Sequence, residues 1–449
     1  MPERKAVTQL ARKKRVARRD VLDGEMQEAI RRFIPSEAFG LLGKSCVTDV
    51  RPGDHVEKTM TILFSDIRDF TPLSERMSPA ENFDFINAYF RRMESVFVRH
   101  NGIIDKYMGD AVMALFPTSP DDAVHCALEM LQRLSGFNNA LKRKRGQAPI
   151  RVGIGLNTGL TMLGVVGGRS HLESTVISDA VNLAARIETL TKSYGTPLLI
   201  SEHTYYGARN IGHHDTRFVD RVKVKGKEQP QSVYEVFDAD PPLLREAKRR
   251  TKGLFEEALA RYHMKEVPAA MELLAQCLAE APDDTAAQVY RARCERFMET
   301  GVHESSGEFD LMIEWNPAVA VGCEEIDEQH RALFDFVKGL VQAIQKTRNL
   351  SEIRTAISFL DNYVAEHFTA EEKLMAEYDY PFLPMQVAEH QRFVDRFGKF
   401  KEEIRKNFRT RRNFLLFHAQ ILLIDWVVNH TSKLDRHFGR YLNRRDAER

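Results

Sequence analysis

The chain has 449 residues, of which 43% are hydrophobic and 29% charged, with a formal net charge of +1. This composition is typical of a globular protein, the length predicts two or three domains, and the near-neutral charge gives no reason to expect a nucleic-acid partner. Five scattered cysteines without a C-x-x-C pair argue against a disulfide framework or a zinc site and favour reduced thiols.

Apolar runs in the chain are short. The longest, from Phe414 to Ile424, is too interrupted to span a bilayer, and the basic start is not followed by the apolar core of a signal peptide. We therefore expect a cytoplasmic protein with no transmembrane segment.

Residues 1–57 are expected to precede the first domain. Residues 1–20 are rich in Arg and Lys, which indicates a solvated basic arm, and we assign this arm no function. Apolar residues recur at helical spacing from Val21 to Leu42, which predicts a lead-in helix that could pair across a dimer.

Residues 58–239 alternate between strand-like and helix-like patterns, which predicts one α/β or α+β domain. The expected strands and helices are Thr59–Ser65, Pro79–Asn101, Ala111–Phe116, Pro120–Arg143, Ile150–Thr158, Ser174–Ile177, Asp179–Tyr194, Pro197–Ser201 and Ser232–Phe237.

Two aspartates in this domain adjoin apolar, strand-like runs. Asp66 ends one run, and Asp110 precedes another in a Gly-Asp step typical of a tight hairpin turn. If the two strands are neighbours, both carboxylates lie at one edge of one sheet. Paired carboxylates on rigid strands suit two Mg²⁺ or Mn²⁺ ions, because these hard cations prefer oxygen ligands. An isolated pair is more often two solvated turn residues, so the neighbouring motifs decide.

Three neighbouring motifs favour phosphate chemistry. Phe70 and Thr71 stand at an expected helix start, where free backbone N–H groups can hold phosphate oxygens. Asn182 and Arg186 are four residues apart on one helix and so share a face. A basic turn spans Lys223 to Lys227. An amide, a guanidinium and an ammonium could orient a ribose and stabilise charge on transferring phosphates.

The order and spacing of these motifs resemble the class III adenylate/guanylate cyclase catalytic domain. The resemblance implies a palm-like (ferredoxin-like) α+β fold and a head-to-tail homodimer with its active sites at the interface. The matching segments are LFSDIRDFTPLSE, IDKYMGDAVMALF, RVGIGLNTGLTMLGVVG, STVISDAVNLAARIE and VKVKGKEQPQSVYEV.

The resemblance also implies residue roles. Two Mg²⁺ or Mn²⁺ ions per active site would be held by one subunit, while the other orients the ribose and stabilises the transition state. The 3′-hydroxyl of ATP then attacks its own α-phosphate, and pyrophosphate leaves. The implied metal ligands are Asp66, Asp110 and the backbone of Ile67, and the implied catalytic residues are Asn182, Arg186 and Lys225.

The choice of purine is expected to depend on Lys106 and Thr175, which match the family's base-contacting positions. Lys106 offers a donor to adenine N1, and Thr175 can accept from the 6-amino group. Guanylate cyclases have Glu and Cys or Ser there, so the pair favours ATP. Asp69 departs from the family, which often has Gly there, and this puts the phosphate loop in doubt. The GGDEF motif of diguanylate cyclases is absent, since this chain has MGDAV.

Residues 240–308 change to a helical, Ala- and Glu-rich pattern that resembles one tetratricopeptide-type hairpin. One unit cannot form a solenoid, so we expect a connector. In the last expected domain, residues 309–449, the pattern is helical from Trp315 to Leu442, with breaks near 348–349, 380–381 and 407–413. Four helices with short loops predict an all-α antiparallel four-helix bundle.

Histidines and carboxylates recur on these helices at spacings that face inward. His367 and Glu371 are four residues apart, and so are Gln386 and His390. Inward His and carboxylate from facing helices are what a dinuclear iron site requires. The candidate ligands are His330, His367, Glu371, His390, His430 and Asp435; His418 and His437 do not fit the set.

This pattern resembles bacteriohemerythrin over about 130 residues, through W-N-P-x-x-x-V-G, I-D-E-Q-H, Y-V-A-E-H-F-x-x-E-E-x-L-M, Y-P and W-V-V-N-H-x-x-x-x-D. The resemblance implies reversible O₂ binding at a non-haem diiron centre bridged by Glu371 and Asp435. Gln386 replaces a family histidine, and an amide is a poorer ligand for Fe(II) than imidazole.

The leading interpretation is an adenylate cyclase regulated by its own O₂- or redox-sensing diiron domain. Two alternatives remain open. One is an O₂- or iron-binding protein whose cyclase half is a dimerisation scaffold, and the other is a guanylate cyclase.

Overall fold

The computed structural model describes residues 40–44, 47–145, 148–168, 172–223, 230–303, 315, 320–346, 350–407 and 411–447. The basic arm, most of the lead-in helix and Lys225 lie outside this part of the chain. Contacts divide the chain into two compact units, the first formed by Met1–His214 with Val236–Ala239 and the second by Asp215–Glu235 with Asp240–Arg449.

Strands and helices alternate through the first unit, and its strands form part of one mixed sheet with the order β2-β3-β1-β4-β6-β8-β7, with β5 paired to β4. This arrangement confirms the α+β class. The elements are β1 (His55–Ile67), α3 (Phe70–Ser74), α4 (Pro79–Arg99), β2 (Ile103–Met108), β3 (Ala111–Phe116), α5 (Pro120–Arg145), β4 (Val152–Gly167), β5 (Leu172–Ile177), α6 (Asp179–Tyr194), β6 (Leu198–Ser201) and α7 (Glu202–Gly207).

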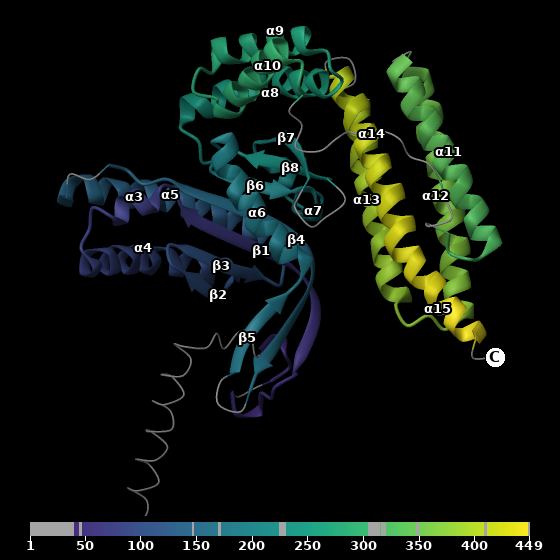
Figure 1. The fold of residues 1–449 in the computed structure, drawn as a ribbon, viewed down its shortest axis with the longest axis horizontal. Helices are drawn as coiled ribbons and strands as arrows, with labels where there is room; N and C mark the ends of the chain where they lie inside the picture. The colour runs from purple at the N-terminus through teal and green to yellow at the C-terminus, as the bar shows by residue number, and fades with distance from the viewer. Residues whose placement is uncertain are drawn as a thin grey trace, which may run out of the picture. The chain divides into compact units, whose positions relative to one another are not determined.

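Strand β1 is central because it pairs antiparallel with β3 on one side and with β4 on the other. Its residues Met60, Ile62 and Leu63 are buried. Helix α4 starts at a capping box in which Ser78 and Glu81 satisfy each other's backbone N–H groups. Helices α4, α5 and α6 each contact strands of this sheet (Figure 1).

Helix α6 packs closely against β4 because β4 carries a glycine at the crossing. A Cβ on Gly155 would lie 2.2 Å from the backbone nitrogen of Glu188, so a side chain there would separate the two elements. Ser178 caps the first turn of α6, and Gly195 ends it with φ 66°. The close contact fixes the exposed face of α6, which carries two of the expected catalytic residues.

In the part of the chain that the structure describes, the second unit contains strands β7 and β8 and the helices from α8 onward. The expected connector is a single helical hairpin, whereas the structure has three helices there, α8, α9 and α10. The elements are β7 (Thr216–Lys223), β8 (Pro230–Val236), α8 (Pro242–His263), α9 (Val267–Glu280), α10 (Thr285–Thr300), α11 (Glu324–Lys346), α12 (Leu350–Glu377), α13 (Leu383–Asn407), α14 (Arg412–Asn429) and α15 (Arg436–Ala447).

Strand β7 is absent from the sequence expectations, because its charged residues do not look like a buried strand. Arg217 is nevertheless fully buried, and its guanidinium contacts Glu235 on β8 at 2.6 Å and Asp284 before α10 at 2.6 and 2.7 Å. Burial opposes the charge of Arg217, but Asp284 and Glu235 more than offset this and raise its pKa. Lys248 on α8 adds contacts of 2.7 Å to Glu235 and 2.6 Å to Asp240.

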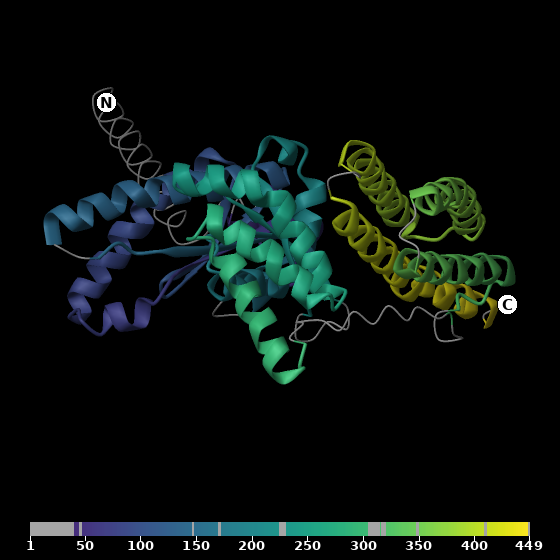
Figure 2. The same cartoon turned by 90° about the horizontal axis from the view of Figure 1, so that it is seen from above.

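Four helices, α11 to α14, lie side by side in Figure 1, and the view from above in Figure 2 shows the same bundle. The expected all-α bundle is confirmed. Between α14 and α15 the chain makes a π-helical turn over His430–Asp435. Its i→i+5 hydrogen bonds bring residues five apart toward one side, and such turns are frequent at functional sites. Across the described residues, no helix has the length and hydropathy needed to cross a membrane.

We expect Asp284→Ala to destabilise the second unit by about 3 kcal/mol, because it removes the carboxylate that forms two of the hydrogen bonds to the buried charge of Arg217. Urea denaturation followed by circular dichroism measures this change. Asp283→Ala is the matched control, since its side chain is exposed beside the same helix start. Equal midpoints for the two variants would contradict the importance of the buried pair.

Candidate active site and candidate metal centre

Asp66 and Asp110 lie together at one edge of the sheet. Strand β1 pairs with β3 in the register Ser65↔Val112, so the end of β1 stands beside the β2–β3 turn that carries Asp110. Gly109 in this turn has φ 67°, which a glycine adopts without strain. Burial, a hydrogen bond to Asp66 and the charge of Asp66 raise the pKa of Asp110 to about 7, against the opposing effect of the Ile67 backbone N–H.

A third carboxyl group, which the sequence analysis missed, stands near this pair. Burial and then the charge of Asp66 raise the pKa of Glu188 to about 7, although Arg68 opposes the shift. Glu188 lies on α6, at the point where Gly155 lets this helix approach β4. The glycines of the G-I-G run in β4 are the signal that could have revealed it. A cation is the partner that would relieve crowding among these carboxyl groups.

Asn182 and Arg186 occupy the outer face of α6, opposite the buried Leu183, Ala184 and Ile187. Asn182 is exposed and Arg186 half-buried. Within the described part of the chain, neither side chain hydrogen-bonds or ion-pairs with Asp66 or Asp110. One subunit therefore does not join the expected catalytic residues to the expected metal ligands through direct contacts. Lys225 lies outside the described residues.

Lys106 is held by two carboxylates. Its Nζ lies 3.3 Å from Glu173 Oε1 on β5 and 3.5 Å from Asp105 Oδ2. Glu173 and Thr175 are two residues apart on one strand, so their side chains project from the same face. The structure therefore joins Lys106 to the strand that carries Thr175. Glu173 is a further residue that the sequence analysis did not identify.

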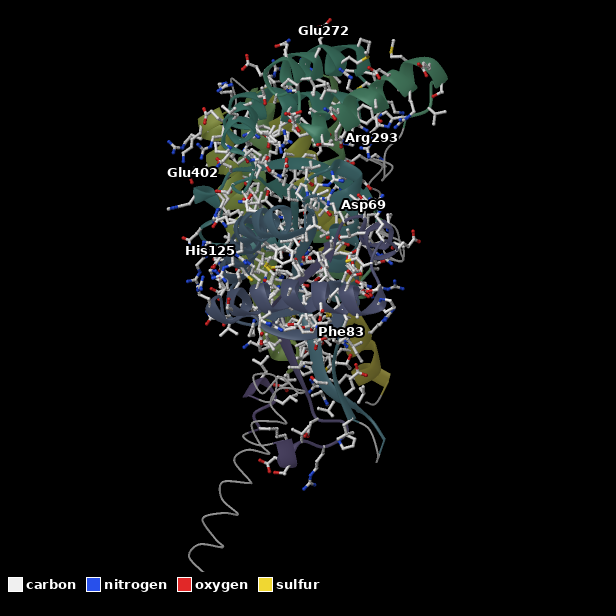
Figure 3. All side chains as sticks on the ribbon, turned by 90° about the vertical axis from the view of Figure 1, so that its left-hand side faces the viewer. Asp69, Phe83, His125, Glu272, Arg293 and Glu402 are labelled. Atoms are coloured by element: carbon white, nitrogen blue, oxygen red, sulfur yellow. The ribbon has the colours of Figure 1, made fainter. Side chains whose placement is uncertain are left out.

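Asp69, the departure from the family pattern, adopts the left-handed conformation with φ 55° and ψ 37° just before α3. Glycine takes this conformation more easily than aspartate. Asp69, which is labelled in Figure 3, instead has two ion pairs, to Arg151 Nη2 and to Lys192 Nζ, each at 3.2 Å. These cations lower its pKa, the hydrogen bond from Lys192 contributing most. The two ion pairs therefore hold the side chain of this left-handed residue.

Phe70 and Thr71 begin α3, which has only five residues. The ring of Phe70 stacks on Phe85 of α4 with the centroids 6.2 Å apart, while Thr71 is exposed. Asp69 makes no side-chain cap to this helix. Phe70 thus anchors the helix start, and its contribution toward a phosphate is limited to the backbone.

In the bundle, four histidines and two carboxylates converge in a fully buried cluster. Glu371 Oε2 lies 3.1 Å from His390 Nε2, 3.4 Å from His430 Nε2 and 4.0 Å from His367 Nε2. Asp435 Oδ2 lies 3.2 Å from His330 Nε2 and 3.4 Å from His430 Nε2. The four histidines and two carboxylates that the sequence predicts as ligands therefore lie in one cluster.

These atoms have the chemistry of metal ligands. Within the described residues, the four Nε2 atoms, both oxygens of Glu371 and Oδ2 of Asp435 form no hydrogen bond despite their burial. Buried polar atoms almost always have a partner, so this concentration indicates that the cluster can hold a cation. Two sets have ligand atoms within 4.8 Å of one another, and the residues therefore fit a dinuclear iron site: His330, His367, His430 and Asp435, and Glu371, His390 and His430.

Outer contacts fix the histidine tautomers. His367 Nδ1 lies 2.8 Å from Gln329 Oε1, and His390 Nδ1 lies 2.7 Å from Glu372 Oε1. With Nδ1–H donating to these oxygens, each Nε2 lone pair is free for a metal. Burial also lowers the pKa of His330 to about 4 and that of His367 well below its usual range. Neutral imidazoles are the ligating form.

Gln386 lies beside the cluster, and its side chain hydrogen-bonds to Asp435, one of the expected metal ligands. Its Nε2–H donates to Asp435 Oδ1 at 2.7 Å, and the residue is 1% exposed. The amide that replaces a family histidine thus orients the neighbouring carboxylate. His418 and His437 bond elsewhere, to the hydroxyls of Tyr234 at 3.1 Å and Tyr380 at 2.6 Å.

Comparisons with known proteins find two families in one chain. Residues 54–236 match the model of the adenylate and guanylate cyclase catalytic domain, and residues 321–442 match that of the hemerythrin HHE cation-binding domain.

Curated relatives match through the first of these domains. An adenylate cyclase of Anabaena cylindrica is 41% identical over 46% of this chain and 43% of its own length. The terminal-differentiation-specific adenylate cyclase of Dictyostelium discoideum is 33% identical over 62% of this chain and 13% of its own length. The chain thus spans less than half the length of these relatives.

Among solved structures, the adenylyl cyclase CyaB from P. aeruginosa is 29% identical, with a TM-score of 0.38, and covers 41% of this chain and 96% of its own. By these family models, residues 54–236 are similar to class III adenylate/guanylate cyclase catalytic domains, and residues 321–442 of the same chain are similar to hemerythrin HHE domains.

Proposed function

We propose that the chain is an adenylate cyclase that converts ATP to 3′,5′-cyclic AMP and pyrophosphate. The observation that carries this proposal is the pair Asp66 and Asp110, whose carboxyl groups meet at the end of β1 with a pKa of about 7 at Asp110. Such a pair repels itself unless a cation lies between its members. The residues fit two Mg²⁺ or Mn²⁺ ions, which would supply Lewis acidity and charge neutralisation when bound.

The reaction is an internal phosphoryl transfer. The ribose 3′-oxygen attacks the α-phosphorus, the bond to the bridging oxygen of the pyrophosphate breaks, and the proton of the 3′-hydroxyl passes to water. In this proposal Asn182 orients the ribose, and Arg186 stabilises the negative charge on the α-phosphate in the transition state. Lys225 contacts the leaving phosphates.

The proposed enzyme is a homodimer, because within the described residues of one subunit Asn182 and Arg186 make no hydrogen bond or ion pair with Asp66 or Asp110. The exposed position of Asn182 on α6 fits a role toward a second copy. Large apolar side chains are also exposed on the neighbouring strands, which supports an interface there. They are Tyr107, Met108, Leu160, Met162, Val166, Leu172 and Ile177.

ATP is the proposed nucleotide because Lys106 donates hydrogen bonds. Guanine presents N1–H and a 2-amino group, which need acceptors, whereas adenine N1 is an acceptor. Glu173 limits the positions of Lys106 Nζ through its 3.3 Å contact. Thr175, on the same strand as Glu173, supplies an acceptor for the 6-amino group.

We expect Asp110→Asn to lower cAMP formation at least a hundredfold with either Mg²⁺ or Mn²⁺, since loss of a metal ligand removes several kcal/mol of transition-state stabilisation. The rate is measured with ATP and GTP in parallel. Asp84→Asn is the control, because Asp84 is exposed on α4. No wild-type turnover with Mn²⁺ would favour the scaffold alternative, and faster turnover of GTP would favour a guanylate cyclase.

We also propose that the bundle binds two non-haem irons and O₂. The unsatisfied Nε2 and carboxylate atoms of the buried cluster support this proposal. His330, His367, His390, His430, Glu371 and Asp435 would hold the irons, and the irons would supply the O₂-binding and redox chemistry when bound. Gln386 keeps Asp435 oriented through its 2.7 Å hydrogen bond.

We expect Gln386→Leu to lower iron affinity about tenfold, because partners of metal ligands typically contribute that much when they orient a ligand. Iron retained after dialysis against a chelator measures the effect. Gln391→Leu on the same helix is the control, since its side chain is exposed. Equal retention in both variants would show that the bond to Asp435 is dispensable.

The proposed role of the bundle is to regulate the cyclase according to O₂ or redox state. We expect different rates of cAMP formation by the ferrous O₂-free, O₂-exposed and iron-free forms of the full chain. Equal rates in all three forms would contradict regulation and leave the cyclase proposal intact.

A further inference from the structure

Helix α14 connects two features of the second unit that lie far apart along its axis. Its last residue, Asn429, directly precedes His430 of the histidine cluster. Its first turn contacts helix α8 and the strand pair β7–β8. With 18 residues it spans about 27 Å. Figure 1 shows its first turns beside α8.

The first turn of α14 is capped by a residue of α8. Arg411 stands at the N-cap position and makes no side-chain cap. Glu257 of α8 accepts hydrogen bonds from the Phe414 backbone N–H at 3.1 Å and from Asn413 Nδ2. A carboxylate at a helix N-terminus satisfies free N–H groups and interacts favourably with the helix dipole. The start of α14 is thus fixed to the connector.

The preceding residue of α8 joins the same helix start to β7. Glu256 is 2% exposed, and its Oε1 accepts the Phe218 backbone N–H at 3.0 Å. Its other oxygen, Oε2, pairs with Arg411. One buried carboxylate therefore bridges the backbone of β7 and the residue that begins α14. Displacing Arg411 would leave Glu256 with an unpaired buried charge.

Side chains of β7 and β8 pack on the same helix. The ring of Phe218 lies 5.9 Å from both Phe414 and Phe417, and Tyr234 Oη lies 3.1 Å from His418 Nε2. The three residues of α14 are buried. Close packing transmits displacement, because such contacts deform little before they break.

Strand β7 ends at Lys223, and the segment that joins it to β8 carries Lys225. In the proposed function Lys225 contacts the leaving phosphates. From these contacts we infer that α14 is the coupling element of the chain: a change at the iron cluster moves α14, and its first two turns shift strands β7 and β8, which flank Lys225 in the sequence. This inference rests on the proposed regulation of the cyclase.

The test compares Glu257→Gln and Tyr234→Phe with wild type and with Glu246→Gln, an exposed glutamate on α8. Each full chain is assayed for cAMP formation in the iron-free and O₂-exposed forms, and the ratio of the two rates is the readout. Glu257→Gln keeps the shape of the residue but weakens the cap, and Tyr234→Phe removes only the hydroxyl that meets His418.

We expect both variants to keep wild-type iron content and iron-free rates, while the ratio of rates moves at least threefold toward one. Glu246→Gln keeps the wild-type ratio. If the wild-type ratio differs from one and both variants retain it, the coupling role of α14 is wrong and regulation stands. A wild-type ratio of one overturns the regulation itself. Should Glu257→Gln fail to fold, Tyr234→Phe still decides, because it leaves the packing in place.

Discussion

Buried charge is the constraint on which the second unit depends. Arg217, Glu256 and Asp284 are almost completely buried, and a buried charge is tolerated only beside a partner. Because the partners lie on different elements, each pairing fixes one element against another: β7 against β8 and α10, and α8 against both β7 and the start of α14. Apolar contacts alone would allow these elements to pack in several alignments, whereas the buried ion pairs are satisfied in only one.

Each of the two candidate metal sites contains a pair of neighbouring carboxyl groups, but the two pairs differ in their exposure to solvent. Asp66 and Asp110 form a half-exposed pair in which Asp66 helps to raise the pKa of Asp110, and the exposure lets a hydrated cation enter and leave. Glu371 and Asp435 are fully buried among imidazoles. A cation there must lose its water, and protein atoms must replace its ligands. The first arrangement suits a metal that arrives with a nucleotide, and the second suits a resident one.

Sequence reasoning was most reliable where local periodicity determines position. The Gly-Asp step placed Asp110 in a turn beside Asp66, and i, i+4 spacing predicted that His367 and Glu371 face inward together. Sequence reasoning failed where the position of a residue depends on contacts with residues that are distant in the sequence. β7 carries Arg217 and Asp220 inside the protein because their partners are distant in sequence, so its pattern does not indicate a strand. The contact of Gln386 with Asp435, and the approach of Glu188 to the aspartate pair, likewise depend on tertiary packing.

The π-helical turn at His430–Asp435 has a consequence for how this domain tolerates changes in length. The other candidate pairs are spaced by four residues, as an ordinary α-helix requires, whereas this pair is spaced by five. Deleting one residue from 431–434 would restore regular α-helical winding and rotate all of α15 by about 100° about the helix axis. Phe438 and Leu442, which are buried in the base of the bundle, would then turn toward solvent. The extra residue therefore determines which face of α15 points toward the hydrophobic core, and the burial of Phe438 and Leu442 stabilises that orientation.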